Sequence, residues 1–281
     1  MGMIFFKGAL HKDSEKIFTI ANRGFLYGDG WFDSLRVAEG KIPLWNLHYA
    51  RIEEAARLLG FNIASLPENN ALLHYAMEVV HANHLKEGRI RLSFFRAEGG
   101  LYAPEVDDID FVVSAKSSEG EGWVLNDTGI DLGLTTVIQK PLQPISRVKS
   151  ANAMVYVLAG REMRASNCHE MVLLNQSGNV CEAISSNLFV VINGAIYTPP
   201  LSEGCVAGIM RQIVIELASE VRQKVFETQL RPSDLLMADE VFLTNSIVGI
   251  KWVGAYKNKK YQHKISSMLS AALPAKIAAM P

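Results

Sequence analysis

Short apolar runs separated by turn residues alternate along the chain with longer segments whose apolar residues recur every three or four positions. The short runs predict β-strands and the longer segments predict amphipathic helices. In chain order, the predicted strands are residues 3–6, 17–20, 35–38, 41–44, 89–95, 109–115, 170–174, 180–183, 188–192, 195–197, 225–229, 240–244 and 250–256. The predicted helices are residues 46–59, 67–84, 150–165, 208–219, 232–237 and 265–279.

Turn residues divide this series of elements into two domains. Asn193-Gly194 is a strong signal for a two-residue β-hairpin. Pro141 and Pro144 follow a strand in the preceding segment and mark the predicted boundary. We therefore predict an α+β (α/β) fold with an N-terminal α/β domain over residues 1–120, a strand and connector over residues 121–144, and a strand-rich C-terminal domain over residues 145–281.

Composition and charge narrow the class of protein. The 281 residues include 28 Lys+Arg and 29 Asp+Glu, a net charge of −1, which argues against nucleic acid or an anionic membrane surface as the main partner. The sequence shows neither a secretory signal nor a long apolar run, so we expect a cytoplasmic protein. The three cysteines have no C-x-x-C spacing, and His81 and His84 have no third partner, so no metal site is predicted.

Two cations break the local pattern. Arg51 lies on the apolar face of the helix predicted at residues 46–59, where burial is costly unless an anion meets it. It is either an anchor for phosphate or carboxylate, or an arginine whose stem packs on the helix while its head reaches water. Lys149 comes directly before the helix predicted at residues 150–165, where the helix dipole and apolar neighbours favour a neutral amine. Such an amine suits a Schiff-base or general-base lysine, the alternative being an ordinary exposed lysine.

Two further features concern anions. Glu182 follows an apolar strand and precedes small and hydroxylic residues, so it is either part of a cleft or an exposed strand end. Gly204 and Gly208 lead directly into a helix, whose first backbone N–H groups can bind phosphate. Residues 24–30 match neither the dinucleotide nor the P-loop glycine spacing, which argues against both ligand classes.

In combination, these features meet the requirements of pyridoxal 5′-phosphate. That cofactor needs a Schiff-base lysine, a carboxylate that keeps its pyridine nitrogen protonated, and a phosphate cup. Lys149, Glu182 and the glycine-led helix start supply one of each, and Arg51 supplies an anion anchor.

The same residues carry a family resemblance over nearly the whole chain. The sequence resembles the class IV (fold-type IV) aminotransferases, the pyridoxal-phosphate family that holds branched-chain and D-amino acid aminotransferases and 4-amino-4-deoxychorismate lyase. The motifs are, in order, residues 23–30 (RGFLYGDG), 32–36 (FDSLR), His48 with Arg51, 149–152 (KSAN), 182–189 (EAISSNLF), 198–201 (TPPL) and 204–211 (GCVAGIMR).

The resemblance implies a fold and a role for each matching residue. It implies a smaller N-terminal α/β domain, a larger cofactor-binding C-terminal domain and a homodimer. Lys149 would form the Schiff base and Glu182 would pair with the pyridine nitrogen. The other implied cofactor-binding residues are Arg51, Asn187, Gly208, Ile209, Met210 and Ser246. The candidates for contacts with the substrate are Arg36, Arg96, Asn245 and Lys251.

Within the family, the motifs favour the lyase. Asn245-Ser246 followed by Gly249, and the run from Gly208 to Gln212, resemble aminodeoxychorismate lyases. That activity converts 4-amino-4-deoxychorismate to 4-aminobenzoate and pyruvate, in folate precursor synthesis. An arginine-rich stretch found in many members is replaced here by residues 96–102, which argues against the lyase. The alternative is an aminotransferase that acts on branched-chain or D-amino acids with 2-oxoglutarate.

Overall fold

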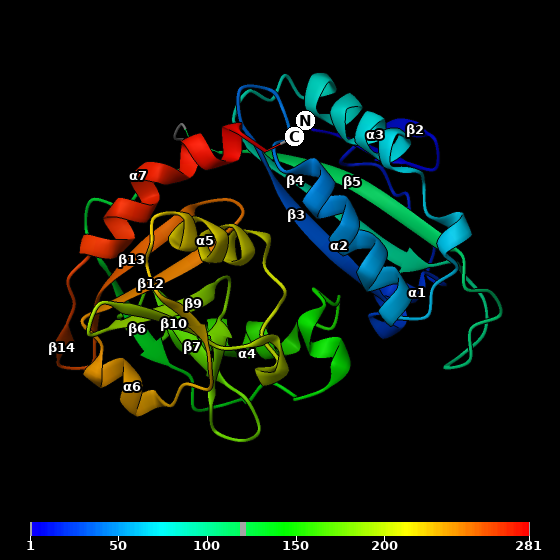
Figure 1. Cartoon of the computed structure of the whole chain (residues 1–281). Helices are drawn as coiled ribbons and strands as arrows, with labels where there is room; N and C mark the ends of the chain where they lie inside the picture. The colour runs from blue at the N-terminus through cyan, green and yellow to red at the C-terminus, as the bar shows by residue number, and fades with distance from the viewer. Residues whose placement is uncertain (1, 119–121, 281) are drawn as a thin grey trace. The chain divides into compact units, whose positions relative to one another are not determined.

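The computed structural model describes residues 2–118 and 122–280, which form two compact units (Figure 1). Of the described residues, the first unit comprises 2–118, Gly122 and Val148–Asn152. The second comprises Trp123–Arg147 and Ala153–Met280. Each unit is described by itself below.

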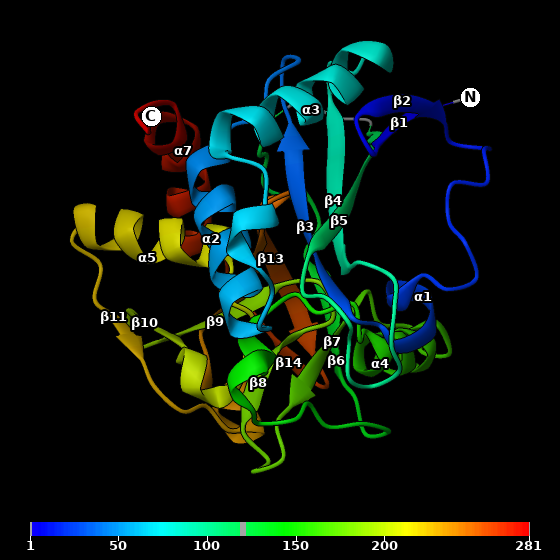
Figure 2. The same cartoon turned by 90° about the vertical axis from the view of Figure 1, so that its right-hand side faces the viewer.

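The first unit is an antiparallel sheet with helices on one face. Its strands are β1 (Met3–Phe6), β2 (Ala9–Lys12), β3 (Gly30–Val37), β4 (Gly88–Arg96) and β5 (Ile109–Ser117), and its helices are α1 (Arg23–Tyr27), α2 (Trp45–Leu58), η1 (Ile63–Ser65) and α3 (Asn69–Ala82). The strands lie in the order β2-β1-β5-β4-β3. Figures 1 and 2 show α2 and α3 along the same face of this sheet.

The core of the first unit follows from the two periodicities of the sequence. Alternate residues of β4, among them Ile90 and Leu92, point to the helix-covered face, as expected for a period of two. Ile52 of α2 and Leu72 of α3 meet them from the apolar stripe of each helix. All four side chains are fully buried, so this layer holds β3, β4 and β5 as a rigid platform.

The second unit is built on a larger, mixed sheet. Its strands are β6 (Ile130–Leu134), β7 (Glu170–Leu174), β8 (Val180–Ala183), β9 (Asn187–Ile192), β10 (Ala195–Thr198), β11 (Val225–Glu227), β12 (Glu240–Asn245), β13 (Gly249–Tyr256) and β14 (Lys259–Lys260). Its helices are η2 (Pro144–Arg147), α4 (Met154–Arg164), η3 (Leu201–Glu203), α5 (Ile209–Glu220), α6 (Pro232–Met237) and α7 (Lys264–Ala278). The strand order is β11-β10-β9-β12-β13-β6-β7-β8, with β14 paired to β13. Helices α5 and α7 lie together against β12 and β13 (Figure 1).

The central strands of this sheet are buried on both faces. Phe189 of β9 and Phe242 of β12 are paired in register, and their rings stack with centroids 4.9 Å apart. Their neighbours Leu188 and Leu243 point to the opposite face and join a second apolar cluster. Burial on both faces explains why the sequence of these strands is continuously apolar rather than alternating.

The segment Val148–Asn152 belongs to the first unit, although second-unit residues flank it on both sides. Its backbone extends the edge of the first sheet: Trp31 and Ser150 form an antiparallel bridge, and the N–H of Phe32 donates to the carbonyl of Lys149 at 2.9 Å. The predicted division at residues 120 and 145 placed this segment in the C-terminal domain. The structure divides the chain differently because long-range backbone pairing, which a linear pattern does not show, fixes the segment.

Three predicted elements differ from the structure. Residues 17–20 are irregular, and Phe18 and Ile20 are exposed, because no strand pairs with them. Residues 41–44 form only a single bridge to Ala38, since Leu44 adopts a left-handed conformation and α2 starts at the next residue. Helix α4 begins at Met154 rather than near residue 150, because the preceding residues pair with β3.

None of the helices within residues 2–118 and 122–280 combines the length and the apolar character that crossing a membrane requires.

Gly30 is a strict requirement of this first sheet, and its replacement tests the arrangement. A Cβ at Gly30 would collide with the backbone carbonyl of Phe94 on β4. We expect Gly30→Ala to lower the free energy of unfolding by roughly 2 kcal/mol, since neither backbone can move freely. Urea unfolding followed by circular dichroism measures the change. The matched control is Gly160→Ala in α4, where a Cβ meets nothing within 4 Å. This substitution should raise the free energy of unfolding by about 0.5–1 kcal/mol. Equal effects of the two substitutions would contradict this account.

Candidate active site

Lys149 lies half-buried on the edge of the first sheet, beside the ring of Phe32. Its Nζ is 4.8 Å from the centroid of that ring, and the guanidinium of Arg91 lies 3.7 Å from the same centroid. The prediction that Lys149 directly precedes a helix is wrong, because Ser150 pairs with Trp31 and α4 starts only at Met154. The helix dipole therefore gives no account of the lysine's reactivity. What the structure shows instead is an amine held against an aromatic ring near a second cation.

Arg51 is held by a buried carboxylate. Its Nε and Nη2 donate to Asp33 at 2.9 and 2.6 Å, a bidentate pair between α2 and β3. Nδ1 of His48, one helical turn earlier, lies 2.9 Å from the same carboxylate. The Arg51 side chain is 15% exposed, whereas Asp33 is buried. Asp33 therefore fixes one edge of the guanidinium and orients the rest of it.

Charge and burial set the ionisation of this group. Burial by itself would raise the pKa of Asp33, but the charge of Arg51 and the hydrogen bonds around the carboxylate outweigh it and hold that pKa well below its usual range. Burial lowers the pKa of His48, against the opposing effect of Asp33. His48 is therefore a neutral donor through Nδ1–H, and Asp33 is an anion.

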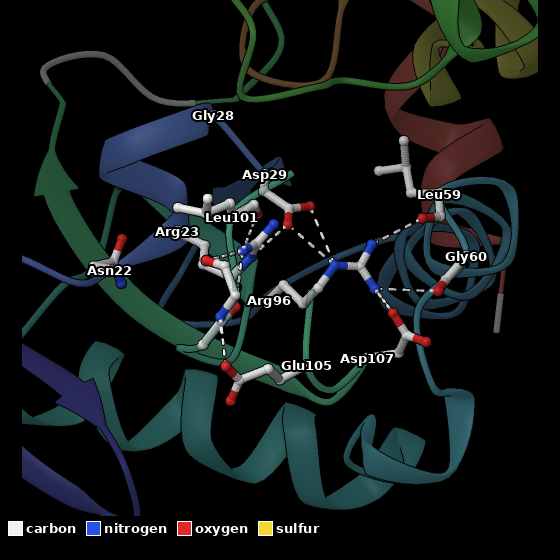
Figure 3. A network of polar contacts seen from close by, with 12 residues as sticks. Asn22, Arg23, Gly28, Asp29, Leu59, Gly60, Arg96, Leu101, Glu105 and Asp107 are labelled. Carbon is white, nitrogen blue, oxygen red and sulfur yellow. Dashed lines mark hydrogen bonds and ion pairs between the residues drawn. The ribbon is translucent and has the colours of Figure 1, made fainter. Parts of the chain in front are cut away.

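Arg96, predicted to contact the substrate, is surrounded by partners within the first unit (Figure 3). Its guanidinium binds Asp29 and Asp107 and donates to the carbonyls of Leu59 and Gly60. These contacts tie the end of α2 to β4. A substrate role for Arg96 stays a prediction, and these contacts already engage all three nitrogens of its guanidinium.

Arg23, the first residue of the 23–30 motif, holds a loop. Its Nη1 donates to the carbonyls of Gly99, Gly100 and Leu101, and its Nε pairs with Asp29 at 2.9 Å (Figure 3). The side chain is buried. This arginine fixes the loop after β4 through main-chain contacts, which the sequence motif did not reveal.

Arg36, the other arginine that was predicted to contact the substrate, has a carboxylate partner within the first unit. Its Nη2 lies 2.8 Å from Glu87, and the side chain is buried at the far end of β3.

Glu182 is a buried carboxylate in the middle of β8, in the second unit. Its Oε1 accepts hydrogen bonds from Nζ of Lys140 at 2.5 Å and from the hydroxyl of Tyr156 at 2.7 Å. Its Oε2 accepts one from the backbone N–H of Val206 at 2.8 Å. The structure thus places Glu182 inside a strand rather than at an exposed strand end.

The contacts of Glu182 leave a place for one more donor. A carboxylate has about four acceptor positions, and the described residues occupy three of them, two on Oε1 and one on Oε2. Burial, and then the charge of Glu182, raise the pKa of Tyr156 well above its ordinary value, so its hydroxyl keeps its proton and donates. The chemistry of this donor set therefore fits a protonated pyridine nitrogen as the fourth partner of Glu182.

The backbone at the start of α5 can be approached closely by a ligand. Gly208 is the N-cap, no side chain caps the helix, and the first turn holds no acidic residue. Nδ2 of Asn187 donates to the carbonyl of Val206 at 2.8 Å, and a Cβ at Gly208 would collide with Oδ1 of Asn187. Uncapped N–H groups at Ile209 and Met210, without side-chain cover at Gly208, fit a phosphate group.

Asn245 shapes the turn between β12 and β13. Its Oδ1 accepts hydrogen bonds from the N–H groups of Ile247 and Val248, and its Nδ2 donates to Ser186 at 3.0 Å. Ser246, at the tip, accepts a bond from the indole of Trp123 through its carbonyl. Lys251 lies half-buried on β13, opposite Leu243 of β12.

The structure brings the predicted residues together in two groups. Lys149 and Arg51 lie in the first unit, and Glu182, Asn187, Gly208 and Ser246 lie in the second. Asp33, Arg91, Lys140 and Tyr156 were missed. Asp33 lies inside the 32–36 motif and Arg91 inside the strand predicted at residues 89–95, but neither was assigned a role. Tyr156 lies seven residues after Lys149, outside the quoted 149–152 motif, so no motif marked it.

The family profile described as Amino-transferase class IV matches residues 30–255. A Vibrio harveyi aminodeoxychorismate lyase is 29% identical over 234 residues, which cover 82% of this chain and 84% of that protein. A Methanocaldococcus jannaschii protein, provisionally named as a branched-chain-amino-acid aminotransferase, is 29% identical over 255 residues, or 88% of this chain and 85% of that one.

Solved structures show the same fold. An aminotransferase from Brucella abortus, solved with the cofactor pyridoxal phosphate, superposes with a TM-score of 0.85 at 26% identity and covers 99% of both chains. A branched-chain amino acid aminotransferase from Escherichia coli gives a TM-score of 0.86 at 22% identity, covering 98% of this chain and 93% of that one.

The chain belongs to the class IV aminotransferase family, since the profile matches well over half of it. The predicted family and the predicted α+β fold class are confirmed, and the fold consists of two sheets. Pyridoxal phosphate is confirmed as the cofactor class of this family by the solved relatives.

The Asp33–Arg51 pair predicts a pH-dependent contribution to stability. At pH 7 we expect Asp33→Asn to lower the free energy of unfolding by roughly 3 kcal/mol, because a buried cation loses its counter-charge. The pKa of Asp33 is lowered in the folded protein relative to about 3.9 in the unfolded chain. Its stabilisation is therefore complete above that value and lost as pH falls further. The gap between wild type and variant should narrow below about pH 4.

Urea titrations at pH 7, 4 and 3 measure this gap. The control is Asp127→Asn at an exposed aspartate, which should shift stability by no more than about 0.5 kcal/mol. A constant gap across the three pH values would show that the ionisation of Asp33 contributes nothing.

Proposed function

We propose that this chain is a pyridoxal-phosphate enzyme in which Lys149 condenses with the cofactor and Glu182 pairs with its ring nitrogen. The observation that carries the proposal is the Glu182 carboxylate: it is buried, charge-paired and short of one donor. Arg51 and the first N–H groups of α5, at Ile209 and Met210, would hold the phosphate. Membership of the class IV aminotransferase family supports these roles.

When bound, the cofactor supplies an electron-withdrawing ring conjugated to the amino-bearing carbon of the substrate. The residues of this chain supply the rest. The amine of Lys149, when free, would remove a proton from that carbon and hold it as an ammonium group. Glu182 keeps the ring nitrogen protonated, because an anion held in a buried site favours the N–H form of its partner.

We propose further that the reaction is the lyase reaction on 4-amino-4-deoxychorismate. Removal of the proton by Lys149 lets the carbon–oxygen bond to the enolpyruvyl group break, the ring become aromatic as 4-aminobenzoate, and the departing group leave as pyruvate once protonated. The turn formed by Asn245 and Ser246 supports this choice, because its sequence resembles the lyases. The similarity to the Vibrio harveyi lyase also supports it.

Aminotransfer is the second candidate, favoured by the similarity to the Methanocaldococcus jannaschii protein. Both reactions need a cation for a substrate carboxylate. The guanidinium of Arg91 and the amine of Lys149 both lie against the ring of Phe32. Arg36 and Arg96 each have carboxylate partners of their own, so we assign the substrate contact to Arg91. The homodimer implied by the family resemblance stays a prediction.

Borohydride trapping tests the cofactor proposal. We expect the protein incubated with pyridoxal phosphate and reduced with borohydride to carry a pyridoxyl group on Lys149, as found by mass spectrometry of a digest. Lys149→Ala should lose the label, whereas Lys116→Ala, at an exposed lysine of β5, should keep it. A label on another lysine, or none, would contradict the proposal.

Product analysis separates the two reactions. With 4-amino-4-deoxychorismate, we expect pyruvate release, followed by a coupled lactate dehydrogenase assay, and no glutamate from branched-chain or D-amino acids with 2-oxoglutarate. The opposite pattern would establish the aminotransferase.

In either assay Arg91→Gln should raise KM on the order of tenfold, since a charge-assisted contact is lost. Arg89→Gln serves as the control, because Arg89 lies two residues away on the same face of β4 as Arg91 but is exposed. Equal KM values for the two variants would show that Arg91 does not contact substrate.

A further inference from the structure

Lys140 is a buried cation to which the proposed function gives no part. Lys140 is 5% exposed, and its Nζ lies 2.5 Å from Oε1 of Glu182. Its backbone is fixed as well, because its N–H donates to the carbonyl of Leu174 at the end of β7, at 2.8 Å. Strand β7 pairs with β8, which carries Glu182. The two charged groups are therefore held in place by the same pair of strands.

The pairing answers an energetic problem. A lone carboxylate withdrawn from water takes up a proton rather than stay charged, unless a cation and hydrogen bonds compensate it. The side chain of Glu182 is 3% exposed. Lys140 supplies the cation, and Tyr156 and Val206 supply neutral donors.

The neighbouring titratable groups do not supply a second cation. Burial, and then the charge of Glu182, raise the pKa of Cys205 to about 12 and raise that of Cys181 further, so both thiols are neutral. Arg211 is engaged with Glu227 at 2.6 Å.

The remaining acid of this region also has its own partners. Glu203 accepts hydrogen bonds from Asn175, Asn179 and Gln229. Among the described residues, Lys140 is the cation that contacts Glu182.

We propose that Lys140 is a positioning residue that fixes Glu182 as an anion. This carboxylate can then accept a hydrogen bond from a protonated ring nitrogen, but it cannot donate one to an unprotonated ring nitrogen. The inference rests on the proposed function for its consequence, but the charge state that it assigns belongs to the protein alone. Without Lys140, the carboxyl would hold a proton in the cofactor-free protein. It would then meet the ring as a donor, and the proton would come from Glu182 rather than from solvent.

Infrared difference spectroscopy of the cofactor-free protein tests the charge state directly. We expect Lys140→Met to add a protonated-carboxyl C=O band relative to wild type at pH 7.5. The band should be missing in Lys140→Met/Glu182→Gln, where the carboxyl is gone, and in Lys140→Arg, where the charge is kept. Tyr156→Phe is the matched control: it removes a hydrogen bond to the same oxygen without removing charge, and it should add no band.

The pH dependence of cofactor affinity gives a second readout. In wild type, binding of pyridoxal phosphate with an unprotonated ring requires a proton from solution, so affinity should fall as pH rises. In Lys140→Met the carboxyl brings that proton. The slope of the logarithm of cofactor affinity against pH should therefore be shallower by up to one, which is a difference of about tenfold in affinity per pH unit. In the Glu182→Gln background, the presence or absence of Lys140 should leave the slope unchanged.

Several outcomes would overturn the inference. Absence of the new band in Lys140→Met, or its persistence in the double variant, would show that Lys140 does not set the charge of Glu182. If Lys140→Met does not fold, recovery of folding in Lys140→Met/Glu182→Gln supports the charge coupling, and failure to recover contradicts it. Failure of the proposed function is distinct: wild type would then carry no pyridoxyl group on Lys149, while the infrared result would still stand or fall by itself.

Discussion

A carboxylate taken out of water must be given a cation and hydrogen-bond donors, and this requirement organises the candidate active site in each unit. In the first unit, Asp33 is compensated by Arg51 and His48. In the second, Glu182 is compensated by Lys140 together with Tyr156. Neither pair is expected to add much net stability, because desolvation offsets most of the attraction. Their value lies in orientation: each holds a charged group in one direction and one ionisation state.

The elements of the second unit were predictable from sequence where local signals were strong. Strands β7 and β8 and helix α6 were predicted with the bounds that the structure shows, because apolar runs there end at turn residues or at proline. Predictions failed where a distant segment decides the backbone. Residues 150–152 were predicted as the start of a helix, but Ser150 pairs with Trp31 of β3, and no local periodicity encodes that partner.

The same limit applies to the candidate site. Lys149, Arg51 and Glu182 could be singled out because each interrupts an apolar pattern or begins a motif. Lys140 could not, since a lone lysine before a proline has no signature, and only the fold shows that it meets Glu182. The choice between lyase and aminotransferase is hard for a related reason. Groups that serve the cofactor suit both reactions, so they do not discriminate between substrates, and relatives of both kinds match at similar identity.

The pairing of Trp31 with Ser150 has a consequence for the order in which the chain can fold during its synthesis. Because synthesis runs from the N-terminus, β5, which ends at Ser117, leaves the ribosome before residue 150 does. The edge of β3 that later receives Lys149 must therefore wait, with its main-chain groups unpaired, while the sheet around it is already complete. The lysine is thus delivered last to a finished scaffold, and a nascent chain that ends short of it would hold the anion anchor without the amine.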